Sequence, residues 1–439
     1  MYQVSAKDLG HFDAVVCGGG IAGVCAAVSA ARNGINVLLV ESSGCLGGTV
    51  TEGLMGNLLD VENKQGIIQQ LQDFLNARNM TCVKSGKRTD ENGKNLPGPL
   101  IDEEDTKYFL DKICAEAGVK VLFHSLVCAA EHTGGHIHSL LLCTECGNYS
   151  VNASIYIDAT GNGSLAALAG CRWECGEPEN GRPHPASMDV NVTGLPDGFD
   201  GTARNPELSA HYVQLMEACG IKTSGGQGKI VRTSDKNVWN TGFNFVYDVM
   251  PDDIESLSRG IYEGRKEAFE VVEAYKQVPG FEGIRLNKTN SHLGIREGRR
   301  ILGVYRLRDA DILEGRRFED GVVLVTAGVD VHKLSADDTP ECSRGYRTRP
   351  FHIPYRCLLP LDSDNLLLAG RCISGDFYPF SAYRMIANMA GTGEAAGYAA
   401  TLCIQQRILP AQVDGKAVSL YMKPYLNEPA KRADCHASQ

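Results

Sequence analysis

A glycine-rich turn between two apolar segments near the amino terminus constrains the fold more than any other feature of this sequence. The apolar run 12–17 ends at the turn 18–23, a segment of small residues occupies 24–33, and a second apolar run occupies 35–40. Gly34 suits the end of a helix. This order is typical of a strand, a helix and a second strand parallel to the first. The sequence therefore predicts an α/β fold that begins with a Rossmann-like βαβ unit.

The turn has the spacing of a dinucleotide-binding motif. Gly18, Gly20 and Gly23 would allow a sharp turn, the close approach of a pyrophosphate and the packing of the helix. Glu41 ends the second apolar run, where a carboxylate can accept hydrogen bonds from ribose hydroxyls. Because a carboxylate repels a 2′-phosphate, NADP is disfavoured, whereas NAD and FAD both remain open on this motif alone.

The rest of the chain predicts a second domain inserted into the first. A length of 439 residues exceeds what one hydrophobic core usually organises. Apolar segments between 119 and 158 predict a β-meander, and residues rich in Gly, Pro, Asn and Ser follow residue 176. A buried-strand pattern returns at 365–369. We therefore expect a discontinuous dinucleotide-binding domain at 1–175 and 351–410, a substrate-facing α+β domain at 176–350, and a carboxyl-terminal surface extension at 411–439.

Further segments match a known family of flavoproteins. They are the turn at 18–23, LGGT at 46–49, IDATGNG at 157–163, REGRRILG at 296–303, IPYRCLLP at 353–360, NLLLAGRCIS at 365–374 and GEAAG at 393–397. With these segments the chain resembles the bacterial FAD-dependent oxidoreductases of the glutathione-reductase-type, two-dinucleotide-binding fold, related to fumarate-reductase-like flavoproteins. The resemblance extends to about residue 410 and indicates no particular substrate.

The resemblance implies where FAD would bind. The adenine half would lie near the first βαβ unit and Val127, the pyrophosphate near the first turn and Arg371, and the isoalloxazine near 47–49 and the start of the last long helix. A helix amino terminus near the flavin pyrimidine would stabilise the negative charge of the reduced cofactor. The implied cofactor-binding residues are Gly18, Gly20, Ile21, Ala22, Gly23, Glu41, Ser42, Gly47, Gly48, Thr49, Val127, Thr160, Gly161, Gly370, Arg371 and Gly393.

Departures from the wider family narrow the chemistry. Disulfide reductases carry a redox cysteine pair just after the GGT segment, where this chain has Val50 and Met55. Relatives with covalent flavin carry a histidine where this chain has Gly48, so the resemblance implies noncovalent FAD. The segment 161–166 resembles a second dinucleotide motif and could be an NAD site. The family pattern instead favours a loop that approaches FAD.

A cluster of cations suggests an anionic substrate. The segment 291–300 concentrates Arg296, Arg299 and Arg300 in a chain that is acidic overall, and guanidinium groups bind carboxylates in bidentate fashion. The alternative is structural: one or two of these arginines could pair with Glu297, Asp309 or Asp311, and this alternative is favoured for Arg300.

The segment 347–356 returns the chain to the first domain, where a cleft between domains would lie. His352 in this segment is the leading candidate for a general acid or base, because the histidine pKa of about 6.5 suits proton transfer at neutral pH. A lone histidine is more often structural. The other catalytic candidates are Tyr355, Arg384 and Tyr378.

These observations predict a flavoprotein oxidoreductase that transfers a hydride between FAD and a small, anionic organic substrate. One alternative is an electron-transfer component whose FAD passes electrons to a partner protein. Another is an NAD-dependent dehydrogenase that uses only the first βαβ unit. We expect an electron acceptor that the sequence does not identify, and we leave open a homo-oligomeric assembly.

Composition excludes other classes of function. With 43 basic and 53 acidic residues the formal charge is -10, which disfavours binding to nucleic acid. No apolar stretch approaches about 18 residues, so we expect no membrane span and a cytoplasmic location.

Cys143 and Cys146 have the spacing of a metal or redox pair, but they straddle a predicted hairpin turn and lack a second pair. We therefore expect no metal site.

Overall fold

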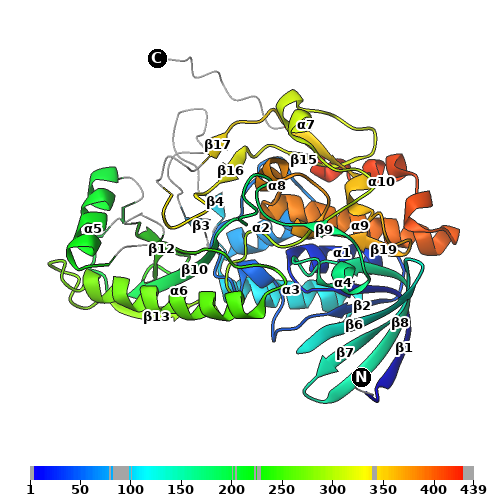
Figure 1. Cartoon of the computed structure of the whole chain (residues 1–439), viewed down its shortest axis with the longest axis horizontal. Coiled ribbons are helices and arrows are strands. Elements are labelled where there is room, and N and C mark those ends of the chain that lie inside the picture. Colours follow the sequence, from blue (N-terminus) through cyan, green and yellow to red (C-terminus); the bar gives the residue numbers. More distant parts are fainter. Residues whose placement is uncertain are drawn as a thin grey trace.

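The computed structural model describes the chain at 4–78, 81–82, 98–99, 101–199, 201–202, 205–221, 224, 229–338 and 344–428. It has the mixed α/β architecture that the sequence predicts, with a Rossmann-like core (Figure 1). Among the described residues, no helix is both long and apolar enough to cross a membrane.

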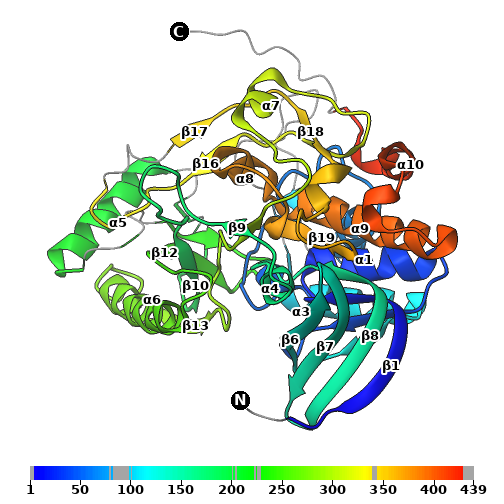
Figure 2. The ribbon, with the colours of Figure 1, turned by 45° about the vertical axis from the view of Figure 1, so that its right-hand side comes forward.

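The central sheet combines a parallel core with an antiparallel meander. Strands β5, β2, β1, β8 and β19 are parallel neighbours in that order, whereas β7 and β6 continue from β8 as antiparallel strands. Figure 2 shows β1, β8, β7 and β6 side by side. The strands are β1 (Lys7–Cys17), β2 (Val37–Val40), β5 (Lys120–Leu122), β6 (Ser125–Thr133), β7 (His136–Thr144), β8 (Gly147–Asp158) and β19 (Leu366–Leu368).

Small residues allow two helices to pack closely beside this sheet. A Cβ at Gly393 or at Gly397 would lie 2.1 Å from a carbonyl oxygen of α1, so the glycines permit the close approach of α9 to α1. The expected small-residue helices are therefore buried against each other. The helices on this part of the molecule are α1 (Ile21–Arg32), α2 (Ile67–Ala77), α3 (Glu103–Ala117), α4 (Ser164–Leu168), α9 (Ile386–Gln406) and α10 (Gly415–Tyr421).

A second, antiparallel sheet has the strand order β11-β12-β10-β13 and is covered by α6. Alternate residues of β10 and the apolar side of α6 form a separate hydrophobic cluster that includes Val190, Val192, Ala268 and Val272. The elements are β10 (Ala186–Thr193), α5 (Pro206–Ala218), β11 (Val231–Arg232), β12 (Trp239–Val246), α6 (Ile254–Tyr275) and β13 (Arg285–Thr289).

The remaining elements are short. They are η1 (Gly48–Val50), β3 (Thr81–Cys82), β4 (Gly98–Pro99), β9 (Trp173–Glu174), β14 (Arg300–Ile301), α7 (Asp309–Glu314), β15 (Gly321–Val325), β16 (Val329–Val331), β17 (Arg344–Tyr346), β18 (Phe351–Pro354), η3 (Tyr355–Leu358), η4 (Gly370–Cys372), α8 (Phe377–Tyr383), η5 (Pro410–Gln412) and η6 (Lys423–Tyr425).

The hydrophobic clusters differ from the expected division of the chain in two places. Ile301, Val322 and Val325 belong to the cluster of the central sheet, although the sequence places 301–334 in the second domain. In the expected surface extension, Val418 and Tyr425 are fully buried in the same cluster. Residues 413–425 thus pack in the core because their apolar side chains cover α9 and β15, and residues 429–439 lie outside the described residues.

The parallel strands position the candidate site. Because β1, β2, β8 and β19 run in the same direction, their carboxyl ends lie at one edge of the sheet. The segments that follow them are the glycine turn at 18–20, the acidic turn at 41–43, the loop at 159–163 and the turn at 369–371. These segments come from both ends of the chain and meet at that edge.

Candidate functional site

The glycine turn after β1 keeps its backbone uncovered. Gly18 has a φ of 99°, and a Cβ there would lie 2.6 Å from the carbonyl oxygen of Ala159. A Cβ at Gly23 would lie 1.8 Å from the carbonyl oxygen of Gly18, so α1 needs glycine to pack. Gly20 is the N-cap of α1, and nothing lies within 4 Å of its Cβ position. Open space therefore lies beside Gly20 at the amino terminus of α1, where helices bind anions.

Glu41, the candidate ribose ligand, holds the glycine turn in place. Its carboxylate is 8% exposed and accepts hydrogen bonds from the backbone N–H of Gly19 at 2.5 Å and of Ser43 at 2.7 Å. The hydroxyl of Ser42 donates to the same carboxylate at 3.1 Å. A carboxylate offers about four acceptor positions, so capacity remains for a ribose hydroxyl. The ribose role of Glu41 stays a prediction, and its anchoring role was not foreseen.

Gly47 and Gly48 extend the same backbone surface. The N–H of Gly47 donates to the carbonyl oxygen of Gly19 at 2.8 Å, and a Cβ at Gly48 would lie 3.3 Å from the Cα of Gly20. Their φ angles are 109° and 56°, which side chains rarely adopt. Thr49 follows them in η1 and is half-buried. The glycine turn and η1 thus lie side by side, as the resemblance implies for a cofactor that continues past the ribose.

Arg371 adds a half-buried cation to this edge. Its guanidinium donates to the amide oxygen of Asn162 at 3.0 Å and lies 2.9 Å from the Cβ position of Gly161. The Nε atom is buried and has no hydrogen-bond partner, and burial lowers the pKa of Arg371 to about 10. Thr160, at the start of the loop, is held by Asp158, which accepts hydrogen bonds from its N–H and its hydroxyl.

The remaining cofactor candidates differ in their exposure and in the residues that they contact. Val127 is half-buried on β6, and Gly370 has a φ of 83°, with its Cβ position 3.2 Å from the Cβ of Ala22. Ala22, like Ile21, is 7% exposed in the first turn of α1. Gly393, by contrast, lies against the backbone of Ala22 from the side of α9. Gly393 therefore supports the packing of the two helices, and a direct contact of Gly393 with the cofactor stays a prediction.

The residues at this edge fit a dinucleotide. The amino terminus of α1 carries partial positive charge, and Arg371 supplies a full charge whose Nε is left without a partner. An anionic pyrophosphate would satisfy both features, because such groups bind at helix amino termini and to guanidinium groups. The open space at Gly20 leaves room for the close approach of phosphate oxygens.

A second group of side chains, which we call the arginine cluster, gathers where the second sheet meets the junction of α8 and α9. It consists of Arg296, Arg384, Asp330, His332 and Asp189. Arg384 ends α8 directly before α9, and its side chain is 10% exposed. It donates to the carbonyl oxygen of Asp330 at 3.0 Å, and the Asp330 carboxylate lies 3.5 Å from Nε2 of His332.

Phe245 on β12 lies between the two halves of the arginine cluster. The guanidinium of Arg296 is 4.9 Å from the centre of the Phe245 ring, and the ring of His332 is 5.0 Å from it. Arg296 also donates to the carbonyl oxygen of Pro185 at 2.8 Å. The structure therefore brings together Arg296, expected to bind an anionic substrate, and the catalytic candidate Arg384, from segments about ninety residues apart.

Burial and neighbouring positive charges shift the pKa values of the residues in the arginine cluster. Burial, followed by the charge of Arg384, lowers the pKa of Arg296 to about 10. Burial and the charge of Arg296 lower the pKa of His332 to about 4. Asp189 has one buried carboxylate oxygen without a hydrogen-bond partner, and burial raises its pKa to about 7, although Arg296 opposes this shift. The cluster therefore combines two guanidinium groups with the carboxylate of Asp330, 3.6 Å from Arg384, and with the carboxyl group of Asp189, whose pKa is about 7.

His352 does not lie in the arginine cluster. Its Nδ1 is 3.2 Å from both the N–H and the carbonyl oxygen of Phe318, and its charged neighbours are Arg317, Glu428 and Asp320. Burial lowers its pKa. These contacts tie His352 to the turn before β15, and a catalytic role of His352 stays a prediction.

The two tyrosine candidates also have structural partners. Tyr355 is 2% exposed and donates to the carbonyl oxygen of Pro410 at 2.9 Å, and burial raises its pKa. Tyr378 donates to the carboxylate of Glu177 at 3.1 Å. Neither of these hydrogen bonds links a tyrosine hydroxyl to Arg296 or Arg384.

Arg300 forms the structural ion pair that was favoured for it. Its guanidinium contacts the carboxylate of Glu297, and both side chains are buried. Glu297 also accepts from the N–H groups of Gly176 and His184, each at 2.9 Å. Glu297 therefore joins the segments 176–184 and 296–300, and removing either partner would leave a buried charge uncompensated.

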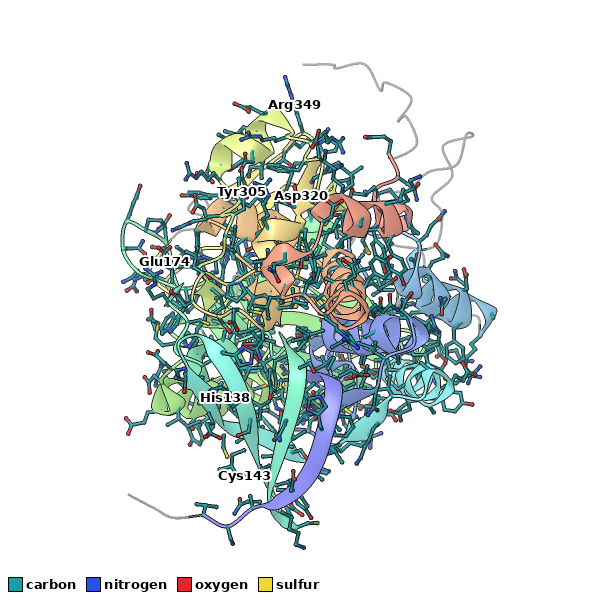
Figure 3. All side chains as sticks on the ribbon, turned by 90° about the vertical axis from the view of Figure 1, so that its right-hand side faces the viewer. His138, Cys143, Glu174, Tyr305, Asp320 and Arg349 are labelled. Atoms are coloured by element: carbon teal, nitrogen blue, oxygen red, sulfur yellow. The ribbon has the colours of Figure 1, made fainter. Side chains whose placement is uncertain are left out.

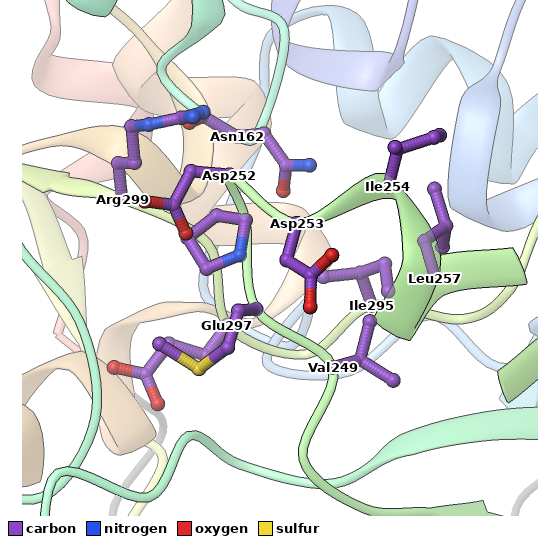
Figure 4. Close-up of a pocket in the computed structure, with 11 residues that line it drawn as sticks. Asn162, Val249, Asp252, Asp253, Ile254, Leu257, Ile295, Glu297 and Arg299 are labelled. Carbon is purple, nitrogen blue, oxygen red and sulfur yellow. The ribbon is translucent and has the colours of Figure 1, made fainter. Parts of the chain in front are cut away.

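A cavity of about 290 Å³ opens on the other side of the same segment. Ile295, Glu297 and Arg299 line it, whereas Arg296 between them does not, as expected when alternate side chains point to opposite faces. Figure 4 shows Arg299 and Asp252 on one side of this cavity and Leu257 on the other. The cavity is thus separate from the arginine cluster, and it borders the dinucleotide edge at Asn162.

A buried ion pair that the sequence analysis missed lies between η1 and α2. Lys64 contacts Asp60 at 3.2 Å, and their side chains are 0% and 2% exposed. Asp60 also accepts from the N–H and the hydroxyl of Thr326 at the end of β15. A lysine in a loop gives no sequence signal for burial, so only the tertiary structure identifies this pair.

An ion pair between His292 and Glu52 connects the segment after β13 to the segment after η1. It makes the stability of the fold depend on pH. Their side chains approach to 2.9 Å, and the N–H of Ser291 donates to the carbonyl oxygen of Glu52. The hydrogen bond to Glu52 raises the pKa of His292. Burial alone would raise the pKa of Glu52, but the hydrogen bond and charge of His292 outweigh it and lower that pKa.

The pair therefore stabilises the fold fully only below the unfolded pKa of His292, about 6.5, and this contribution is lost as the pH rises through the folded pKa. On the acidic side it is lost as the pH falls through the folded pKa of Glu52. We expect the imidazole of His292 to titrate above about 6.5 by NMR. In the variant Glu52→Gln its pKa should fall, and an unchanged pKa would contradict the pairing.

Comparison with protein families identifies the class. A family model described as FAD dependent oxidoreductase matches residues 13–422. The chain therefore belongs to this family, and its cofactor is FAD, which agrees with the dinucleotide edge described above. The narrower glutathione-reductase-type and fumarate-reductase-like lineage stays a prediction. No curated protein sequence matches the chain.

Solved structures with a similar chain path are distant in sequence. A geranylgeranyl bacteriochlorophyll reductase-like protein from Thermoplasma acidophilum is 15% identical, with a TM-score of 0.49 over 96% of this chain and 83% of that chain. A p-nitrophenol 4-monooxygenase from Pseudomonas putida DLL-E4 is 12% identical, with a TM-score of 0.48 over 94% and 84% of the two chains. Similarities at this level carry no information on the substrate.

Proposed function

We propose that this FAD-dependent oxidoreductase oxidises or reduces a small anionic organic molecule, which Arg296 and Arg384 hold beside noncovalently bound FAD. The observation that carries the proposal is the arginine cluster, in which Arg384 acts electrostatically to lower the pKa of Arg296. Asp330 lies 3.6 Å from Arg384, and Asp189 and Asp330 act on Arg296, yet the two guanidinium groups still repel each other, so an added anion would stabilise both. Arg384 directly precedes α9, whose start is the implied position of the isoalloxazine.

The two-electron chemistry, a hydride exchange with the substrate, is what FAD supplies when it is bound. The side chains supply position and proton transfer. Arg296 and Arg384 would orient a carboxylate, since guanidinium groups bind carboxylates with fixed geometry. Asp189, with its pKa raised to about 7 by burial, would hold or release the proton that accompanies the redox step. Asp189 replaces His352 as the candidate acid or base.

Anaerobic reduction tests this proposal. The purified protein should be yellow, and denaturation should release the pigment as FAD if binding is noncovalent. We expect members of a panel of hydroxy, amino and unsaturated carboxylic acids to change the flavin spectrum, whereas the corresponding amides do not. If no small molecule changes the spectrum but a redox protein forms a stable complex, the electron-transfer alternative is correct.

Substitution of the arginines should separate anion binding from folding. We expect Arg296→Lys or Arg384→Lys to lower kcat/KM for a carboxylate substrate by about 100-fold, because a lysine cannot form the bidentate contact. Arg265→Lys, at an exposed position of α6, serves as the matched control and should have no effect. An equal loss for carboxylates and amides would argue against anion binding.

A further inference from the structure

Two cysteines of the meander lie unusually close together. Cys128 on β6 and Cys143 on β7 have their Sγ atoms 2.8 Å apart, and both side chains are half-buried. The pairing of β6 with β7 shifts between Val127 and Ala129, which leaves Cys128 at a β-bulge. Figure 3 shows Cys143 on the central sheet.

This proximity distinguishes the pair, because no other hydrogen bond between two sulfur atoms occurs among the thiols of the described residues. Cys17, Cys25 and Cys357, for example, are fully buried in apolar surroundings, which suits inert thiols. The backbone already holds Cys128 and Cys143 on adjacent strands, so a disulfide, with an S–S length of about 2.05 Å, needs only a small further approach of the two atoms.

We propose that Cys128 and Cys143 are a redox modification site that closes to a reversible intramolecular disulfide by exchange with a low-molecular-weight disulfide. The Cys143 thiolate attacks one sulfur of the small disulfide, which releases one small thiolate and leaves a mixed disulfide on Cys143. The Cys128 thiolate then attacks the Cys143 sulfur and releases the second small thiolate. Two protein thiols and one small disulfide thus become one protein disulfide and two small thiols.

The surroundings of the pair favour this order of attack. Burial, followed by the hydrogen bond and charge of Cys143, raises the pKa of Cys128 to about 11. The Cys128 thiol also donates a hydrogen bond to the carbonyl oxygen of Leu141 at 3.3 Å, which favours its protonated form. Because only thiolates attack disulfides, Cys128 is the poorer first nucleophile toward a molecule from solution. Once Cys143 carries the mixed disulfide, the short distance to Cys128 favours the intramolecular step.

Peptide mapping of the holoenzyme tests the proposal. The protein is equilibrated without oxygen in mixtures of oxidised and reduced glutathione, quenched with acid, alkylated and cleaved after glutamate. Glu131 separates Cys128 from Cys143, and Glu145 separates Cys143 from Cys146, so these three cysteines fall on three different peptides. We expect a linked Cys128–Cys143 peptide whose amount rises with the proportion of oxidised glutathione and disappears on reduction.

Variants supply matched controls. In Cys128→Ser the linked peptide should be absent and glutathione should remain on Cys143, whereas Cys146→Ser, at an exposed turn, should leave the linked peptide unchanged. Full alkylation of Cys128 and Cys143 in the wild type at every glutathione ratio would overturn the proposal, as would a link between Cys143 and Cys146. The wild-type map decides the question even if a variant fails to fold.

Discussion

Gly20→Val should weaken the binding of FAD by at least about 100-fold, or about 2.7 kcal/mol, while the apoprotein remains as stable as the wild type. Nothing lies within 4 Å of the Cβ position of Gly20, and its backbone is extended, so the protein itself accommodates a β-branched side chain. The added atoms would occupy the space where the pyrophosphate must approach the amino terminus of α1.

The measurement is the dissociation constant for FAD, from fluorescence titration of the apoprotein, together with its denaturant midpoint. Gly345→Val is the matched control, because Gly345 lies exposed on β17 and its Cβ position makes only ordinary contact. It should change neither quantity. Retention of FAD by Gly20→Val with wild-type affinity would show that the open space beside α1 is not the cofactor groove.

Lys64→Met should lower the free energy of unfolding by about 3–5 kcal/mol, because it leaves the carboxylate of Asp60 buried without its cation. The measurement is the denaturant midpoint of the apoprotein. Removing both charges should restore most of the loss. In the double variant Asp60→Asn, Lys64→Met, the amide oxygen can still accept from Thr326.

Asparagine is the appropriate replacement at this position for a second reason. Asp60 has a φ of 60°, a left-handed conformation that asparagine tolerates better than most residues. A double variant as unstable as Lys64→Met would show that packing of the lysine side chain, rather than compensation of charge, supports this loop.

The sequence predicted those parts of the fold that depend on local pattern. The βαβ unit at 12–40 was recognisable because strand periodicity, glycine positions and helix boundaries all lie within a few turns of chain. The late strand at β19 was recognisable as a short apolar run that ends in Ala369 and Gly370. The FAD assignment followed from the resemblance of several segments to a flavoprotein family and is confirmed by the family to which the chain belongs.

Features that depend on tertiary packing could not be predicted in this way. Nothing in the local sequence distinguishes His352, which supports a turn, from His332, which lies in the arginine cluster. Asp189 is one of the alternating polar residues of β10, and its raised pKa arises from burial. The same holds for residues 413–425, whose short amphipathic pattern is compatible with either a surface helix or the core position that the structure shows.

The cofactor edge has a consequence for protein synthesis. The glycine turn precedes Arg371 by most of the chain, yet the two must meet to complete one binding surface. A nascent polypeptide on the ribosome therefore exposes its first βαβ unit long before β19 and α9 can cover it. Contacts of such long sequence separation form slowly, so we expect chaperones and free FAD to increase the yield of active protein during expression.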